Sequence, residues 1–263
     1  MLDGGCLLRQ VPLLGLAAHQ AKLTMPALVA PVPEERLSPY RRLPSLAGER
    51  DERAAAVDLV RRAMQASRDA GTRTIALDFG RLPLGGEEAD LRRHFARREL
   101  DEGEPGRRLL EGVLAERRSF GEQWVDRCRL SLEAILRYAV PMDVQLAIVP
   151  AASPWGVPTP REAVQLIGDF AGAPVGAVFS PGRLAVLAAL GLGVAAERRA
   201  VLREKALLVE AADAVGLDCP LPFGLGEVDA AELAGFAAEI PVVLAGPPDT
   251  TPAELKAARL VLG

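Results

Sequence analysis

The stretch VQLAIVPAASPWGVPTPREAVQLIGDFAGAPVGAVF, residues 144–179, holds one complete strand–helix–strand pattern. It begins and ends with the apolar runs Val144–Val149 and Pro174–Phe179, which suit strands buried on both faces of a sheet. Between them, Thr159–Glu162 (TPRE) has an N-cap threonine, a proline at the first helical position and a glutamate that can reach back to the cap. The stretch therefore predicts a βαβ unit with parallel strands.

The same pattern recurs along the chain. Apolar and polar positions alternate with helical periodicity over Glu52–Ala70, where Gly71 suits a C-terminal cap, and over Phe120–Ala139. Thr251 and Asp229 each resemble a further N-cap and predict two more helices. The remaining strand-like runs are Thr24–Ala30, Arg73–Phe79, Lys205–Val209 and Pro241–Ala245.

Alternating strands and helices fit either a closed barrel or an open, doubly wound sheet. No G-x-G-x-x-G follows a predicted strand and no Walker A motif occurs, so the open nucleotide-binding sheet loses its main support. We therefore predict an α/β fold, a single (β/α)8 TIM-barrel domain over residues 1–263. For residues 1–23 two alternatives stay open: a compressed first unit, or a barrel that lacks one.

Five segments resemble, in chain order, the xylose isomerase-like barrels, a family of sugar phosphate isomerases and epimerases with related AP endonucleases. The first, Ala70–Gly80 (AGTRTIALDFG), is similar to the family strand that ends in His-Pro-Gly. The resemblance covers residues 52–262 and implies a functional face at the carboxyl ends of the strands. The other four segments are Leu146–Pro150, Val175–Arg183, Pro222–Asp229 and Val242–Ala245.

In that family, histidine and carboxylate side chains at the strand ends hold divalent metal ions, and most of the matching positions differ here. Glu210 and Asp213 match a His-x-x-Asp strand end, and Asp218 matches a retained aspartate. The replaced ligands are now Asp78, Val149, Ser180, Arg183, Pro220 and Ala245. Apolar side chains offer no donor, and the arginine adds a permanent positive charge. The resemblance therefore implies that the usual metal site is lost.

The candidate site consists of the polar side chains that the resemblance places at the barrel mouth. The expected catalytic residues are Asp78, Glu210 and Asp218. The expected ligand-binding residues are Trp155, Ser180, Arg183, Asp213 and Glu227, and no metal ligand is expected. We expect Asp78, Ser180, Arg183 and Asp218 to converge. The histidines, His19 and His94, follow no predicted strand, so histidine-based catalysis or zinc binding is not expected.

Each of three candidates also has a purely structural interpretation. Arg183 can clamp a carboxylate or phosphate of a ligand, or it can pair with Asp78 or Asp218 and fill the space of the metal. Trp155 can stack on a sugar or cover the core. Glu227 can contact a ligand or help to start the helix at Asp229.

Composition limits the remaining functions. The net charge is −4 with both signs interspersed, which argues against a nucleic-acid-binding protein. The three cysteines include no C-x-x-C pair, as in reduced cytoplasmic proteins, and no apolar run is long enough to span a membrane. A homo-oligomer is compatible with the sequence.

Two functions stay open. The first is a divergent sugar phosphate isomerase- or epimerase-like barrel without cofactor that binds a small molecule, such as a sugar, carboxylate or phosphate, or a partner. The alternative is an active sugar isomerase or epimerase that uses Mg²⁺ or Mn²⁺ on a carboxylate site, since these ions prefer oxygen ligands. The sequence does not decide whether the chain is an enzyme.

Overall fold

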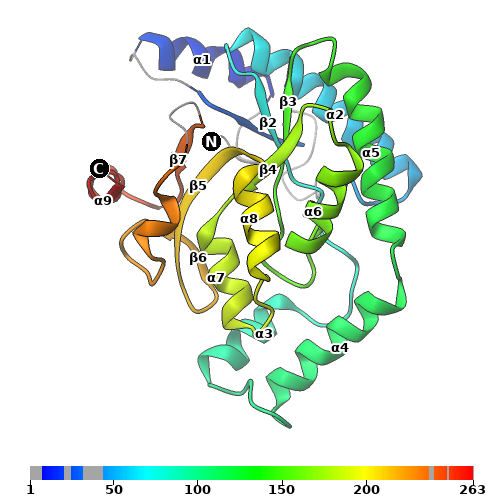
Figure 1. Cartoon of the computed structure of the whole chain (residues 1–263), viewed down its shortest axis with the longest axis vertical. Coiled ribbons are helices and arrows are strands. Elements are labelled where there is room, and N and C mark those ends of the chain that lie inside the picture. Colours follow the sequence, from blue (N-terminus) through cyan, green and yellow to red (C-terminus); the bar gives the residue numbers. More distant parts are fainter. Residues whose placement is uncertain (1–7, 21–24, 32–43, 237–239, 248, 263) are drawn as a thin grey trace.

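The computed structural model describes residues 8–20, 25–31, 44–236, 240–247 and 249–262 of the chain (Figure 1). Its strands are β1 (Leu28–Ala30), β2 (Thr74–Leu77), β3 (Gln145–Ile148), β4 (Val175–Phe179), β5 (Ala206–Val215), β6 (Asp218–Pro222) and β7 (Val242–Leu244). The α-helices are α1 (Val11–Gln20), α2 (Arg50–Asp69), α3 (Glu88–Ala96), α4 (Pro105–Ser119), α5 (Gln123–Ala139), α6 (Pro160–Asp169), α7 (Pro181–Ala189), α8 (Ala196–Glu204) and α9 (Pro252–Leu262). The short 3₁₀ helices are η1 (Leu8–Gln10) and η2 (Ala230–Leu233).

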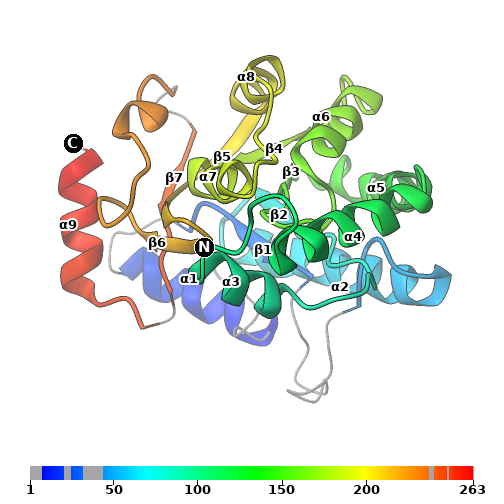
Figure 2. The same cartoon turned by 90° about the horizontal axis from the view of Figure 1, so that it is seen from below.

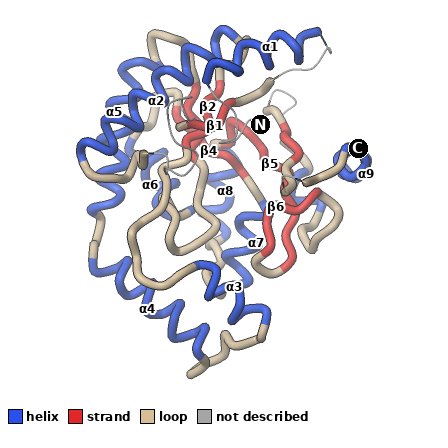
Figure 3. The backbone as a smooth tube through the Cα atoms, turned by 180° about the vertical axis from the view of Figure 1, so that it is seen from behind, coloured by secondary structure: helices blue, strands red, loops and turns tan. Residues whose placement is uncertain are grey.

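The strands form one curled sheet with helices around it (Figure 3). Neighbouring strands pair in parallel in the order β1-β2-β3-β4-β5-β7, with Ile75 opposite Leu146 and Val209 opposite Val242. The predicted parallel arrangement of β2, β3 and β4 is therefore confirmed. Helices alternate with these strands, so the fold is the predicted α/β barrel. Within the described residues, no pair joins β1 to β7.

One strand departs from the prediction. β6 folds back on β5 in an antiparallel hairpin, with Val215 opposite Asp218 and Gly216 at a φ of +57° in the turn. β5 also continues to Val215, whereas the apolar run predicts its end at Val209. The apolar pattern does not predict this extension of β5, because the extension contains Glu210 and Asp213. Both are buried polar residues whose charges are compensated only in the folded chain.

The helix starts were predicted with mixed success. Thr159 and Glu162 form a complete capping box at the start of α6. Thr251 and Glu254 exchange the same hydrogen bonds before α9. Asp229, in contrast, caps only the four-residue η2. The longer helix predicted there is wrong, because Ala234 is extended and Gly235 adopts a φ of +75°, which ends the helical turn.

The core has two layers, one outside and one inside the curled sheet. Alternate strand residues such as Ile75 and Leu77 face the helices, whereas Ala76 faces inward. The inner layer consists of small or branched side chains, namely Ala27, Ala76, Ala147, Val149, Val178, Leu208 and Val243. Val149, which stands where the family has a glutamate, is thus part of an apolar barrel interior.

The segments that follow the strand ends cover the mouth of the barrel. Figure 2 looks onto this end, where α3 and α4 lie on one side and β6 on the other. Both helices belong to the long connection between β2 and α5. None of the described helices combines the length and the apolar character that crossing a bilayer requires.

Candidate functional site

A buried ion pair occupies the mouth at the ends of β4 and β5. Ser180 follows β4 and is the N-cap of α7, Arg183 lies in the first turn of that helix, and Glu210 lies on β5. Arg183 Nε lies 2.6 Å from Glu210 Oε2, and its Nη2 lies 3.3 Å from Oε1. The Glu210 side chain is 3% exposed and that of Arg183 is 30% exposed. A two-point contact of this kind fixes the orientation of both side chains.

The surroundings keep both partners charged. Burial by itself raises the pKa of Glu210, but the charge and hydrogen bonds of Arg183, with a hydrogen bond from Ser180, hold it below its ordinary value. Burial disfavours the charged form of Arg183 as well, and the attraction of Glu210 outweighs it, so the pKa of Arg183 is raised. The sequence analysis expected Asp78 or Asp218 as the structural partner of Arg183; the partner is Glu210 instead.

The space beside this pair is small. Pro150, Ala151, Ser180, Arg183 and Leu184 contribute to the lining of a cavity of about 10 Å³. Such a volume holds about one water molecule. This cavity is therefore too small for a sugar, and the accessible part of the pair is the Arg183 side chain, which is 30% exposed.

The other predicted catalytic carboxylates do not join the pair. Asp78 is exposed after β2, and its Oδ1 accepts a hydrogen bond from the Gly80 amide at 2.8 Å. Asp78 still acts on Arg183 through its charge. The side chain of Asp218 is 80% exposed and lies 3.4 Å from Arg92. Of the four residues expected to converge, Ser180 and Arg183 contact each other and Asp78 acts on Arg183 through its charge, whereas Asp218 contacts Arg92.

The alternation of side chains along β6 explains the position of Asp218. Asp218 and Pro220 are exposed, whereas Cys219 between them is partly buried and close to Gly182. Burial raises the pKa of the Cys219 thiol to about 11. The charge of Arg183 lowers this pKa and the charge of Glu210 raises it. Sequence reasoning missed Cys219 as a neighbour of the mouth because no sequence pattern predicts the antiparallel hairpin that brings it there.

Asp213 has a structural environment. It is fully buried, and its carboxylate accepts hydrogen bonds from the amides of Ala214, Gly224, Gly226 and Val228 at 2.8–2.9 Å. Three of these bonds, from Gly224, Gly226 and Val228, hold the segment after β6 against β5; the fourth comes from the neighbouring residue of β5 itself. No face of the carboxylate is exposed to a ligand, so the geometry gives no support to the predicted ligand-binding role. Glu227 lies in that segment with an exposed side chain, and its amide donates to Ala214.

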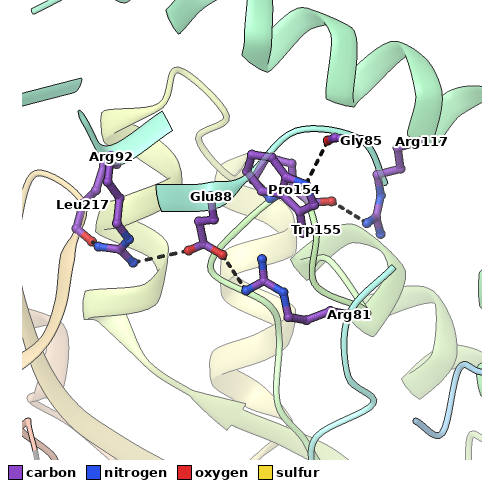
Figure 4. A network of polar contacts seen from close by, with 8 residues as sticks. All are labelled: Arg81, Gly85, Glu88, Arg92, Arg117, Pro154, Trp155 and Leu217. Atoms are coloured by element: carbon purple, nitrogen blue, oxygen red, sulfur yellow. Dashed lines mark hydrogen bonds and ion pairs between the residues drawn. The ribbon is translucent and has the colours of Figure 1, made fainter. Parts of the chain in front are cut away.

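Trp155 is 3% exposed and joins two loops at the mouth (Figure 4). Its Nε1 donates to the Gly85 carbonyl at 3.2 Å, and its own carbonyl accepts from the Leu82 amide. Arg117 donates to the Pro154 carbonyl at 2.8 Å and pairs with Glu162 of the capping box. Trp155 therefore covers the core rather than presenting a face for a sugar.

A second chain of contacts in Figure 4 connects α3 to the β5–β6 turn. Glu88 pairs with Arg81 at 2.6 Å and with Arg92 at 3.3 Å, and Arg92 also donates to the Leu217 carbonyl. Sequence reasoning missed both this chain and Arg117. Their partners lie on other segments of the chain, and no local pattern marks them.

The described side chains at the mouth do not supply the donor set that a divalent metal ion needs. Among the residues that the structure describes, no three histidine, cysteine, aspartate or glutamate side chains gather closely enough to hold one. The carboxylate site of Asp78, Glu210 and Asp218 is therefore not assembled. Glu210, which is the one buried member, already has a guanidinium where a cation would bind.

The comparisons with known proteins rest on structure alone, since no family model and no curated protein matches the sequence. A D-tagatose 3-epimerase-like protein superimposes with a TM-score of 0.65 at 16% identity, covering 97% of this chain and 81% of the other. A xylose isomerase domain protein of Planctomyces limnophilus gives 0.57 at 13% identity, covering 97% and 79%. The zinc-bound IolI protein gives 0.58 at 14% identity, covering 95% and 79%. The chain therefore has the fold of the xylose isomerase-like barrels.

Proposed function

We propose that this chain is a metal-independent binding protein built on the barrel of the sugar isomerases and epimerases. One observation carries the proposal: the Arg183–Glu210 ion pair lies at the strand ends where the resemblance places metal ligands. A guanidinium stays protonated in proteins, so it would repel a divalent cation at this position. Metal-assisted isomerisation has no assembled donor set among the described residues.

The groups that remain accessible at the mouth define the ligand class. Asp78 presents an exposed carboxylate, and the Arg183 side chain is 30% exposed and contacts Glu210 through Nε and Nη2, which leaves Nη1 outside this ion pair. Such groups recognise hydroxyl, carboxylate or phosphate groups of a small polar molecule. The proposed ligand is therefore a sugar or a sugar derivative that carries an anionic group.

The proposal is tested on the purified chain by elemental analysis and by proton NMR with added ketohexoses and sugar phosphates. We expect less than stoichiometric metal, no isomerised or epimerised product, and ligand line broadening that disappears in the Arg183→Met variant. Asp218→Asn serves as the control, because this side chain is 80% exposed and contacts Arg92 instead of Arg183. Epimerised product together with bound metal would contradict the proposal, and so would ligand binding that is unchanged in Arg183→Met.

A further inference from the structure

A groove on the outer side of the barrel, between α2 and α5, is separate from the mouth. Figure 1 shows these two helices on the flank of the barrel, and their residues pack against each other. The groove has a volume of about 420 Å³. Its lining includes Arg50, Arg53 and Val57 of α2 and Leu130, Ala134 and Tyr138 of α5.

The groove contains an apolar stripe that the barrel does not use. Leu130, Ala134 and Tyr138 recur every four residues and so share one face of α5. Leu130 is 51% exposed and Tyr138 is 43% exposed. The buried face of α5 is a different one, made by Trp124, Val125, Cys128, Ser131, Leu132, Ile135 and Ala139. Two apolar stripes on one helix indicate that the second packs against something else.

Two arginines lie beside this stripe. In the described part of the chain, no carboxylate lies within ion-pair distance of Arg50 or Arg53, and Arg53 donates only to the Gly48 carbonyl at 3.1 Å. Arg61, further along α2, differs because Asp58 lies 2.7 Å away and neutralises it. One end of the groove therefore carries two positive charges, one helical turn apart, that no described carboxylate neutralises by an ion pair.

We propose that this groove docks an amphipathic helix of a partner protein, with an apolar stripe flanked by two acidic residues one turn apart. A groove between two helices accepts the side-chain ridge of a third. The acidic residues would face Arg50 and Arg53, and the apolar stripe would cover Leu130 and Tyr138. A second copy of this chain is disfavoured, because the carboxylate in the groove lining, Asp58, is already paired with Arg61 and is not free to neutralise the arginines of a partner groove. A planar lipid surface could not fill the concave groove.

This inference goes beyond the proposed function and does not depend on it, since none of the lining residues belongs to the mouth. The test uses two fluorescently labelled synthetic helical peptides with the same leucine stripe, one flanked by glutamates and one by lysines. Binding to the full chain is measured by fluorescence anisotropy at low and high salt. We expect the glutamate peptide to bind about tenfold or more tightly than the lysine peptide, and salt to weaken it.

The decisive variant is Arg50→Glu/Arg53→Glu, which should reverse the preference between the two peptides. The matched control is Arg108→Glu/Arg118→Glu on α4. Arg108 donates to the carbonyl five residues before it, as Arg53 does, and Arg118, like Arg50, has no ion-pair partner among the described residues. The control should keep the preference, and circular dichroism should show both variants folded.

Three results would overturn the inference. The first is no binding of the glutamate peptide at millimolar concentration. The second is equal binding of the two peptides, or a preference that survives Arg50→Glu/Arg53→Glu. The third is binding to phosphatidylserine vesicles, lost in the same variant, without any binding of the glutamate peptide; this result would assign the groove to a membrane surface.

Discussion

Strand β5 carries two buried carboxylates whose charges are compensated in different ways. Glu210 lies at the mouth and faces the guanidinium of Arg183, whereas Asp213 lies in the hairpin and accepts four backbone amides. The charge of Glu210 is compensated mainly by one side chain, so a single substitution can remove that compensation. The compensation of Asp213 is built into the backbone. A buried carboxylate in a barrel of this fold can therefore hold two segments together as readily as it can act as a reactive group.

The largest effect is expected for Asp213→Asn. The amide nitrogen of asparagine would face backbone donors, so buried N–H groups would lose their acceptor. We expect the free energy of unfolding to fall by about 4 kcal/mol or more, measured by urea denaturation. Asp218→Asn on the same hairpin is the control and should change stability by less than about 0.5 kcal/mol. A loss below about 1 kcal/mol for Asp213→Asn would show that the four amide contacts do not stabilise the hairpin.

The next effect is expected for Arg183→Met, which leaves Glu210 buried without its partner. We expect a loss of about 2–3 kcal/mol, below the full cost of breaking a buried pair because the arginine side chain is partly exposed. The double variant Arg183→Met/Glu210→Leu should be more stable than Arg183→Met alone, since it removes both charges. Additive losses in this double-mutant cycle would mean that the two side chains do not stabilise each other.

A smaller effect is expected from pH. The pKa of folded Glu210 is below its ordinary value of about 4.5, so its contribution to stability is fully present above that value. The contribution should be lost as pH falls through the lowered pKa. The difference in unfolding free energy between the wild type and Glu210→Gln should therefore shrink as the pH falls from about 5 toward 2. A difference that stays constant over this range would contradict the assigned ion pair.

The smallest effect is expected for Asp78→Asn, the predicted catalytic residue that remains exposed. Its carboxylate accepts a hydrogen bond from the Gly80 amide, and the side-chain oxygen of asparagine can accept the same bond. The melting temperature should be almost unchanged, with less than about 0.5 kcal/mol in stability. A large destabilisation would show that Asp78 takes part in the Arg183–Glu210 ion pair. The groups at the mouth could then not be divided into buried, paired ones and accessible ones.

The regular part of the fold could be predicted from local sequence. Buried parallel strands are apolar over their whole length, as in Val175–Phe179, and a capping box such as that of Thr159 places a helix start within a residue. The hairpin could not be predicted in the same way. Its strands contain Asp213 and Asp218, so they lack an apolar run, and Asp213 is compensated by residues up to 15 positions away.

The candidate site was predictable only in part. The resemblance placed Ser180 and Arg183 together at the end of β4, and the structure does the same. It gave no partner for Arg183, because an ion pair between two strand ends depends on the register of the sheet and not on sequence spacing. Trp155 shows the same limit: its position after β3 suggests the mouth, but its burial depends on the distant Gly85 loop.

If the Arg183–Glu210 ion pair stands in place of a metal site, calorimetric titration of the purified chain with Zn²⁺ and Mn²⁺ should detect its consequence. We expect no saturable binding in the micromolar range, for the wild type and for Asp78→Ala alike. Stoichiometric, tight binding in the wild type that disappears in Asp78→Ala or Glu210→Ala would contradict it, and would assign the mouth to metal-dependent chemistry.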